Sequence, residues 1–467
     1  MAEARTVTDV VVFLPGIMGS TLQRGNHQLW APSGGAVIEA VHTAGASLKG
    51  LQLPEGVGDD HPGDGVEPGV VMRDVHVLPG IWTAHVGYGL MLSWLQGRFG
   101  LVPVTRDGPP GNLLAVPYDW RLSNRFNGRR LATFVEPTLE RWRGQGGQFA
   151  DAKVVFICHS MGGLVARWYI QREGGAKITG KLITLGTPHR GSLNSLEQLV
   201  NGVHKGPWPF RIDLTDFARS LPSTHQLLPQ YACLENGNQL AKTIEVPLPW
   251  LSTSMVSDAM CFHDQLNDPA NPSWGAGFDL YPIQGQMQQT ATTARLVDEK
   301  IVPITTIDAV DEGGDATVPA LSAMPEAVRA DSPIIRHVTE RHGALQSNRS
   351  VFDEIEGVLT ASKVTHRAPT DTQVDVRVED VFEAGESPMV EAVFPPGQSP
   401  EPLEAILVDE SGNELDRERM TKVGEVLRTQ FDPPMAGGYQ VVVRGYGTAR
   451  GSVAQVTAPL FVWEPHP

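Results

Sequence analysis

The sequence predicts an α/β protein whose mostly parallel central sheet is covered by helices on both faces and is followed by a small β module. Apolar runs of strand length alternate with segments of helical spacing between residues 10 and 185. This alternation is typical of a doubly wound sheet. After residue 370, apolar residues alternate with charged ones between turn-forming residues, a pattern typical of a β-sandwich.

The elements of the first half follow from apolar spacing. The segment 86–99 carries leucines and a phenylalanine at helical intervals, and Gly100 is the expected end of that helix. The same reasoning predicts helices at 122–142 and 161–172. Short apolar runs predict strands at 10–14, 112–116, 154–157 and 181–185.

The pattern loosens between about 193 and 302, where prolines interrupt it. An insertion of this size between two sheet strands is expected to be a cap over an active site. Four aromatic residues would supply its apolar walls: Trp208, Phe210, Trp250 and Trp274. The alternative is a surface excursion whose aromatic residues pack only among themselves. Further strands are predicted at 303–309 and 334–338, and a closing helix at 350–359.

We therefore expect two domains. The first spans residues 1–365 and contains the cap at about 193–302; the second is a β-sandwich of the immunoglobulin-like type over residues 370–467. No chemistry-bearing motif is visible in the second domain, so we expect a structural or docking appendage. The sequence does not identify a protein partner for it.

Composition excludes several functions. The formal charge of −16 argues against nucleic acid as a partner and against electrostatic docking on anionic lipid, although an apolar patch of the cap could still touch a membrane transiently. The three cysteines have no metal-type spacing, and we expect free thiols, with a Cys233–Cys261 disulfide as the alternative. We expect no metal and no cofactor. The first residues contain no signal peptide and the chain no transmembrane run, which predicts a cytoplasmic location.

The pentapeptide Cys158-His159-Ser160-Met161-Gly162 lies between a predicted strand and a predicted helix. A turn this tight lifts the central side chain clear of the sheet and brings the following N–H groups to a helix N-terminus. This arrangement suits a nucleophile, here Ser160. The usual motif is Gly-x-Ser-x-Gly, and Cys158 replaces its first glycine.

A serine nucleophile needs a base, an acid that orients the base, and donors for an oxyanion. Asp315 and His342 follow Ser160 in the chain order of hydrolases of this kind, and each lies in a loop after a late strand. The alternative acids are Asp308 and Asp311, and the alternative bases are His159, His189 and His337. His159 is expected to be packed, His189 comes too early in the chain, and His337 lies within a predicted strand.

The glycine-rich turn 15–20 follows the first strand and has no lysine, so it is a poor phosphate loop. Its two glycines allow the backbone to approach a ligand closely and to present an N–H group, that of Ile17.

Five segments together resemble the lecithin:cholesterol acyltransferase-like family of α/β-hydrolases, which includes lysosomal-type phospholipases A. They are Leu-Pro-Gly-Ile-Met-Gly-Ser at 14–20, Pro-Tyr-Asp-Trp-Arg at 117–121, His-Ser-Met-Gly-Gly at 159–163, Gly-Asp-Ala-Thr-Val-Pro at 314–319 and His-Gly-Ala-Leu at 342–345. The segment 221–229 within the cap is also similar to a recurrent family segment. The resemblance covers about residues 10–359 and omits the β module.

The resemblance implies an α/β-hydrolase fold with Ser160 as nucleophile, Asp315 as acid and His342 as base. The N–H groups of Ile17 and Met161 would form the oxyanion hole. We therefore expect a serine acyl-ester hydrolase that acts on lipid esters without metal or cofactor, with acyl transfer to an alcohol as an additional activity. The alternatives are a non-catalytic binding protein that works through its β module, and an enzyme with Cys158 as nucleophile.

Overall fold

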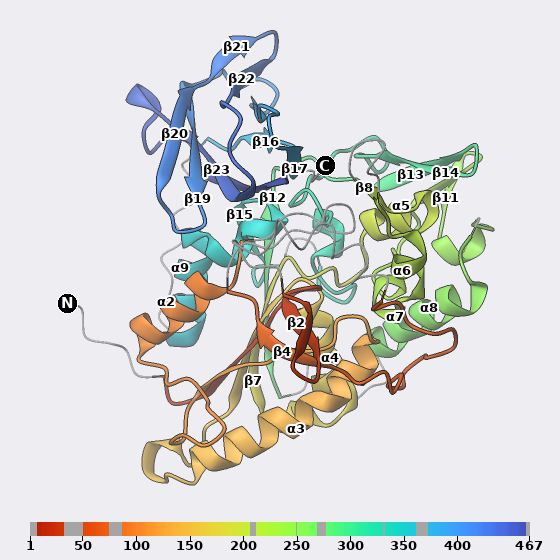
Figure 1. Cartoon of the computed structure of the whole chain (residues 1–467), viewed down its shortest axis with the longest axis vertical. Helices are drawn as coiled ribbons and strands as arrows, with labels where there is room; N and C mark the ends of the chain where they lie inside the picture. The colour runs from red at the N-terminus through yellow and green to blue at the C-terminus, as the bar shows by residue number, and fades with distance from the viewer. Residues whose placement is uncertain are drawn as a thin grey trace.

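A computed structural model describes residues 7–31, 50–73, 86–205, 212–248, 250–268, 277–329, 332–360 and 372–463. Its centre is a six-stranded sheet with the strand order β15-β12-β7-β6-β1-β5, in which all neighbours are parallel. Figure 1 labels β15, β12 and β7 of this sheet. Because the strands are parallel, their C-terminal ends meet at one edge. The strands are β1 (Val10–Leu14), β5 (Leu113–Ala115), β6 (Val154–His159), β7 (Thr179–Leu185), β12 (Asp279–Gln286) and β15 (Arg336–Thr339).

Helices cover both faces of this sheet, because consecutive apolar side chains of β1 point to opposite faces and all of them are buried. Val10, Val12 and Leu14 belong to one apolar core with α3 (Asn124–Arg143) and α4 (Gly162–Arg172). Val11 and Phe13 belong to a second core with α2 (Gly89–Phe99) and α9 (Arg349–Thr360). Successive side chains of a strand point to opposite faces, so one strand serves both cores. The predicted doubly covered sheet is confirmed.

The prediction that the sheet resumes at 303–309 is wrong. The strand next to β7 is β12, and Pro282 within it pairs with Thr184. Proline cannot donate a ladder hydrogen bond, and its presence normally argues against a central strand. Residues near 303 instead end β14 (Lys300–Ile304), which belongs to a separate four-stranded sheet. The excursion after β7 therefore ends before Asp279, and a second excursion separates β12 from β15.

The two excursions pack together into one layer, which keeps the name cap from the prediction. It contains α5 (Leu193–Asn201), α6 (Thr215–Ser220), α7 (Pro222–His225), α8 (Thr253–Asn267) and the pair β8 (His204–Lys205) and β9 (Ile212–Asp213). A four-stranded sheet completes it with β11 (Gln239–Ala241), β10 (Leu234–Asn236), β13 (Thr293–Val297) and β14. Of the four predicted wall residues, Trp208, Phe210 and Trp274 lie outside the described residues, and Trp250 is 70% exposed.

After β1 the chain forms a small antiparallel sheet of β2 (Ser20–Arg24), β3 (His27–Trp30) and β4 (Val66–Val71). Short 3₁₀ turns occur at η1 (Gly147–Phe149), η2 (Gly175–Lys177), η3 (Thr243–Glu245), η4 (Ala320–Ser322), η5 (His342–Ser347) and η6 (Gly447–Ala449). Among the described helices, none combines the length and the apolar character needed to span a bilayer.

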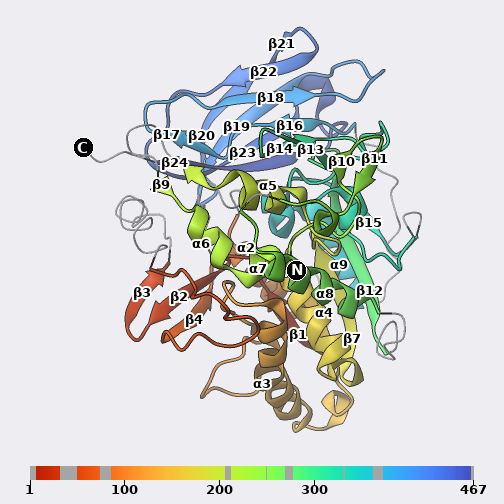
Figure 2. The same ribbon diagram turned by 90° about the vertical axis from the view of Figure 1, so that its right-hand side faces the viewer.

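The C-terminal module consists of two sheets that share one apolar core (Figure 2). The first contains β16 (Asp375–Arg377), β18 (Met389–Val393), β22 (Val426–Gln430) and β21 (Thr421–Val423). The second contains β17 (Val381–Glu383), β24 (Val456–Trp463), β23 (Gly437–Gly445), β19 (Leu403–Asp409) and β20 (Glu414–Arg419). The predicted β-sandwich is confirmed. The predicted boundary at 365–370 lies outside the described residues.

Candidate active site

Ser160 occupies a sharp turn between β6 and α4. Its φ of +52° is in the left-handed region, which a residue other than glycine adopts rarely and at a cost in free energy. The backbone of Ser160 is held on both sides: its N–H donates to the carbonyl oxygen of Leu185 at 2.9 Å, and its carbonyl accepts from the hydroxyl of Thr187 at 2.8 Å. The predicted elbow is therefore present, and its strain is supported by β7 and the loop after it.

Glycines allow the turn 15–19 and the elbow to touch. A Cβ at Gly16 would lie 3.0 Å from the Cβ of Ser160. A Cβ at Gly162 would overlap with the carbonyl oxygen of Pro15, and one at Gly163 with the hydroxyl of Thr187. These close approaches explain why positions 162 and 163 are glycines.

Ser160, His342 and Asp315 form a continuous hydrogen-bonded chain. The Nδ1 atom of His342 lies 2.7 Å from Oδ2 of Asp315, and its Nε2 atom lies 2.9 Å from Oγ of Ser160. A carboxylate only accepts, so Nδ1 carries the proton and Nε2 is left as an acceptor for the hydroxyl. All three side chains are buried. The structure thus brings together the three residues that the sequence singled out.

Backbone contacts set the position of the acid and of the imidazole. The second carboxylate oxygen of Asp315 accepts from the N–H groups of Thr317 and Val318, at 3.0 and 2.6 Å. The N–H of His342 donates to the carbonyl of Asp315 at 2.7 Å. At Gly186, where φ is +56°, a Cβ would lie 2.8 Å from Oδ2 of Asp315 and 3.0 Å from Nδ1 of His342. Only a glycine leaves room there for the acid–imidazole bond.

The two predicted oxyanion donors flank Ser160. Ile17 lies in the turn that contacts the elbow, and Met161 follows Ser160 directly at the N-terminus of α4. In the part of the chain that the structure describes, neither backbone N–H donates to a protein acceptor. Both are buried, and the N-terminal end of a helix favours negative charge. The role of these two N–H groups as donors to an oxyanion stays a prediction.

One part of the site was missed by the sequence analysis. The hydroxyl of Tyr88 accepts from the N–H of Gly16 and contacts Nδ1 of His159, both at 2.9 Å. The Nε2 atom of His159 lies 3.0 Å from the carbonyl oxygen of His342. A carbonyl only accepts, so Nε2 of His159 is the protonated nitrogen and Nδ1 accepts from Tyr88. Tyr88 and His159 thus connect the turn at Gly16 to the backbone of His342, and His159 is packed as predicted.

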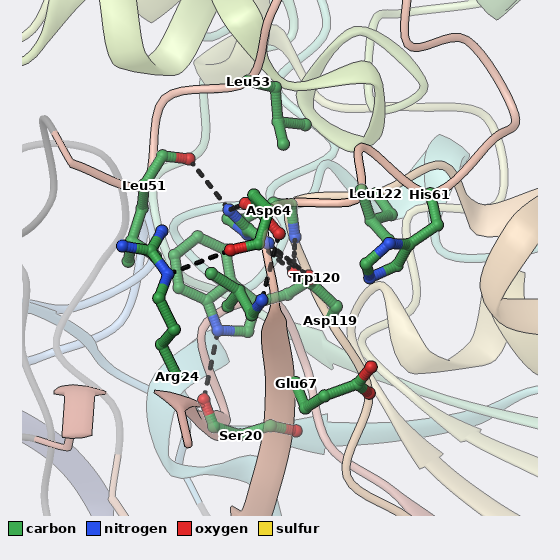
Figure 3. Close-up of polar contacts among 12 residues, drawn as sticks. Ser20, Arg24, Leu51, Leu53, His61, Asp64, Glu67, Asp119, Trp120 and Leu122 are labelled. Carbon is green, nitrogen blue, oxygen red and sulfur yellow. Dashed lines mark hydrogen bonds and ion pairs between the residues drawn. The ribbon is translucent and has the colours of Figure 1, made fainter. Parts of the chain in front are cut away.

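The Pro-Tyr-Asp-Trp-Arg motif holds both ends of the turn 15–20. The hydroxyl of Tyr118 donates to the carbonyl of Pro15 at 3.0 Å, and the indole N–H of Trp120 donates to the carbonyl of Ser20 at 3.1 Å. Figure 3 shows the second of these contacts below the carboxylates of Asp64 and Asp119. The motif therefore positions the turn and does not supply a reacting group.

Arg121 joins this motif to the loop before β4. Its guanidinium is fully buried and binds the carboxylate of Asp119 at 2.7 Å and that of Asp64 at 2.8 Å. It also donates to the carbonyl of Leu51 at 3.2 Å (Figure 3). A buried guanidinium is tolerated only with such partners, so Arg121 fixes the 51–64 loop against the motif.

The family-like segment at 221–229 packs on the same motif. The hydroxyl of Ser223 donates to the carbonyl of Trp120 at 2.6 Å. The side-chain oxygen of Gln226 accepts from both the backbone and the side-chain amide of Asn124, at 2.7 and 3.0 Å. The cap is thereby attached at α7 to the start of α3.

The alternative acids and bases do not reach Ser160. Asp308 and Asp311 are exposed, and Asp311 binds the backbone N–H of Gly313. His337 lies in β15 and binds Gln284 at 2.8 Å. His189 binds Thr184 and Arg167, and burial, with help from the Arg167 charge, holds the pKa of His189 well below its ordinary value.

The three cysteines are free thiols, and the alternative Cys233–Cys261 disulfide is not formed. Cys158 is fully buried in the core between the sheet, α3 and α4. Burial raises the pKa of its thiol well above the ordinary value. The thiolate is the nucleophilic form, so this environment disfavours reaction at Cys158.

Comparison with known proteins agrees with the resemblance seen in the motifs. Residues 108–260 match the profile of the Lecithin:cholesterol acyltransferase family. This range includes the Pro-Tyr-Asp-Trp-Arg motif, the elbow and the segment at 221–229. The family match indicates an enzyme of the acyl-ester hydrolase or acyltransferase class, on an α/β-hydrolase-type fold. No curated protein matches the chain in sequence.

Three solved structures show distant similarity. Bacillus licheniformis lipase BlEst2 in its propeptide form is 11% identical over 98% of this chain and 94% of its own, with a TM-score of 0.38. The mature form of that lipase is 12% identical over 77% of this chain and 95% of its own, with a TM-score of 0.35. CopC from Methylosinus trichosporium OB3b is 15% identical over 21% of this chain and 97% of its own, with a TM-score of 0.18.

Proposed function

We propose that the protein is a serine acyl-ester hydrolase of the lipase or phospholipase type, which acts on lipid esters and can transfer the acyl group to an alcohol. The observation that carries this proposal is the chain of hydrogen bonds from Asp315 through His342 to Ser160. The family match supports lipid esters as the substrate class.

In this mechanism His342 acts as the general base. Its Nε2 accepts the proton of Ser160 as Oγ attacks the ester carbonyl carbon, and Asp315 stabilises the imidazolium that forms. The N–H groups of Ile17 and Met161 donate to the oxyanion. One such donor is typically worth about 3–4 kcal/mol in the transition state. His342 then protonates the leaving alcohol, and an acyl group remains on Ser160.

Release of the acyl group repeats the same steps in reverse. Water, or an alcohol in the case of transfer, gives its proton to His342 and attacks the acyl carbonyl. No metal or cofactor has a role in these steps. Hydrolysis and transfer differ only in which acceptor reaches the acyl-enzyme.

The cap is the part of the molecule that we expect to touch a lipid surface. Ile244 and Trp250 lie six residues apart in it and are 48% and 70% exposed. Exposed apolar side chains on a protein of net charge −16 favour apolar contact with lipid over electrostatic docking.

A panel of p-nitrophenyl esters, triacylglycerols and phospholipids tests this function, with wild type and Ser160→Ala assayed side by side. We expect hydrolysis by the wild type and a loss of at least about 10³-fold in Ser160→Ala. An added primary alcohol should divert part of the acyl group into a new ester. Equal activity of the two proteins would refute the proposal. Absence of Ser160-dependent turnover on every ester would favour the alternative, a binding protein on a hydrolase scaffold.

A further inference from the structure

The C-terminal module packs directly against the loops that carry Asp315 and His342. The segment after β12 meets the module at β16, where Gln288 contacts Val374 and Val376, and the segment after β15 meets it at β24, where Glu340 contacts Thr457. An open groove of about 480 Å³ runs along part of this contact and is lined by residues of both parts, among them Ala316, Arg341, Val376 and Phe382. Polar side chains of Glu340, Gln288 and Arg341 join the module to the two loops beside this groove.

Glu340 makes the first of these contacts, two residues before His342. Its side chain is buried, and Oε1 accepts from the N–H of Thr457 in β24 at 2.7 Å and from the N–H of Arg341 at 2.9 Å. Its Oε2 accepts from the side-chain amide of Asn348 at 3.0 Å, at the start of α9. One carboxylate thus joins the module to both ends of the turn that contains His342.

Gln288 makes the second contact, next to the acid. Its side-chain amide donates to the carbonyl of Val374 and accepts from the N–H of Val376, each at 3.1 Å, as a strand partner of β16 would. The backbone N–H of Gln288 donates to the carbonyl of Gly314 at 3.0 Å, adjacent to Asp315. A single residue therefore links the module backbone to the loop of the acid.

Arg341 makes the third contact, adjacent to His342. Its guanidinium donates to the carbonyls of Val376 and Val378 and pairs with Asp380 at 3.2 Å. Glu340 and Arg341 lie within two residues of His342 in sequence. Gln288 bonds to Gly314, the residue before Asp315. A module that served only as an appendage would not need to meet both loops at these positions.

We propose that the C-terminal module is a positioning element of the active site, which holds the loops of Asp315 and His342 in register through Gln288, Glu340 and Arg341. This proposal rests on the proposed function of Ser160, Asp315 and His342. The reaction depends on the Asp315–His342 bond and on the His342–Ser160 bond, and a small displacement of either loop lengthens one of them. Gln288, Glu340 and Arg341 are positioning residues that act through the two loops.

The test uses the full chain and exchanges the roles of two hydrogen-bonded side chains. Glu340→Gln keeps an oxygen that accepts from the N–H of Thr457 in the module, but it places an amide group opposite the donor amide of Asn348. The bond that connects this module-bound side chain to the start of α9 is therefore lost. The double variant Glu340→Gln/Asn348→Asp restores it with donor and acceptor reversed. Asp at 348 still caps α9, because Asn348 caps it through its oxygen, which accepts from the N–H groups of Ser350 and Val351. Gln288→Met removes both module contacts of Gln288 at nearly constant volume.

Turnover of p-nitrophenyl butyrate is measured per active site, with sites counted by a fluorophosphonate probe. We expect kcat to fall at least about tenfold in Glu340→Gln and in Gln288→Met, with KM changed less than twofold, and the double variant to recover to within about threefold of wild type. Arg417→Ala is the matched control. It removes ion pairs to Glu404 and Glu414 inside the module, and its kcat should equal that of wild type.

Three outcomes would overturn the positioning role. They are a lowered melting temperature with unchanged kcat per titrated site, absence of recovery in the double variant, and a kcat that rises when the contacts are removed. Failure of the proposed function is seen separately, because wild type would then lack Ser160-dependent turnover and would not take up the probe. If one variant does not fold, the other still decides between these results.

Discussion

The imidazole of His159 donates a hydrogen bond from Nε2 to the backbone carbonyl oxygen of His342, at 3.0 Å. Its other nitrogen accepts from the hydroxyl of Tyr88, which in turn accepts from the N–H of Gly16. Through these bonds the residue before Ser160 connects the turn 15–20 to the backbone of His342. Tyr88 is fully buried, and burial raises the pKa of its hydroxyl, so it stays protonated and can donate.

Tyr88→Phe should therefore slow the reaction without weakening substrate binding. The variant leaves the N–H of Gly16 and Nδ1 of His159 without the hydroxyl, and each loss of this kind is worth about 1–2 kcal/mol. We expect kcat to fall about tenfold and KM to stay within twofold in an ester assay. Tyr231→Phe is the control, since that hydroxyl binds the carbonyl of Thr292 within the cap. An equal loss in both variants would argue against a specific role of Tyr88.

Gly186→Ala should separate the acid from the imidazole. The added Cβ would lie 2.8 Å from Oδ2 of Asp315 and 3.0 Å from Nδ1 of His342, in a backbone conformation with φ of +56°. We expect kcat to fall about 100-fold, because displacements on the order of 1 Å have effects of this size. Gly180→Ala, near the start of β7, the strand that Gly186 follows, places a Cβ 3.4 Å from the side chain of Lys153 and should have little effect. A kcat of Gly186→Ala near that of wild type would show that the reaction tolerates displacement of Asp315 from His342.

Arg121→Met should destabilise the fold. Asp119 is 1% exposed, and loss of its guanidinium partner leaves a buried carboxylate uncompensated. Removal of one member of a buried pair typically costs about 3–5 kcal/mol. Urea unfolding should show a decrease of that size, whereas Arg130→Met, at an exposed 3.5 Å pair with Glu67, should change the free energy of unfolding by less than about 1 kcal/mol. A small effect at Arg121 would mean that Asp119 finds other donors or takes up a proton.

Glu340 should make stability depend on pH. Burial raises its pKa from 4.5 to about 7, although Asn348 and the N–H groups of Thr457 and Arg341 lower it. The folded state then binds a proton more tightly than the unfolded state. The resulting stabilisation is complete below pH 4.5 and is lost as the pH rises through about 7, with a slope of at most about 1.4 kcal/mol per pH unit.

The contribution of Glu340 to stability is isolated by measuring the free energy of unfolding of wild type and of Glu340→Gln at pH 5, 6, 7 and 8. The free energy of unfolding of wild type minus that of the variant should fall as the pH rises. A difference that is constant with pH would mean that Glu340 has the same pKa in the folded and the unfolded protein.

Much of the site could be predicted because its residues are tied to strand ends. Ser160 follows β6 at a turn with a distinctive sequence, and a parallel sheet brings the loops after β12 and β15 to the same edge. Chain order therefore selected Asp315 and His342 among several acids and histidines, and the structure places both next to Ser160. The catalytic roles of these residues and the cytoplasmic location stay predictions.

Other features could not be predicted because they depend on contacts between distant segments. Pro282 argued against a strand at β12, and only the pairing with β7 and β15 outweighs that signal. Tyr88 comes from a segment without a motif and lies 72 residues from Gly16 in sequence. Glu340 is an ordinary charged residue in sequence, and its burial follows from the docking of β24. None of these three has a local signature.

The reactivity of Ser160 is tested most directly by intact-mass and peptide mass spectrometry after treatment with a fluorophosphonate. We predict one covalent adduct per chain on Ser160 in wild type, no adduct in Ser160→Ala, and labelling at least about 10³-fold slower in His342→Ala, because His342 supplies the base. A wild-type protein that takes up no label, or that carries it on a residue other than Ser160, would contradict the proposed nucleophile.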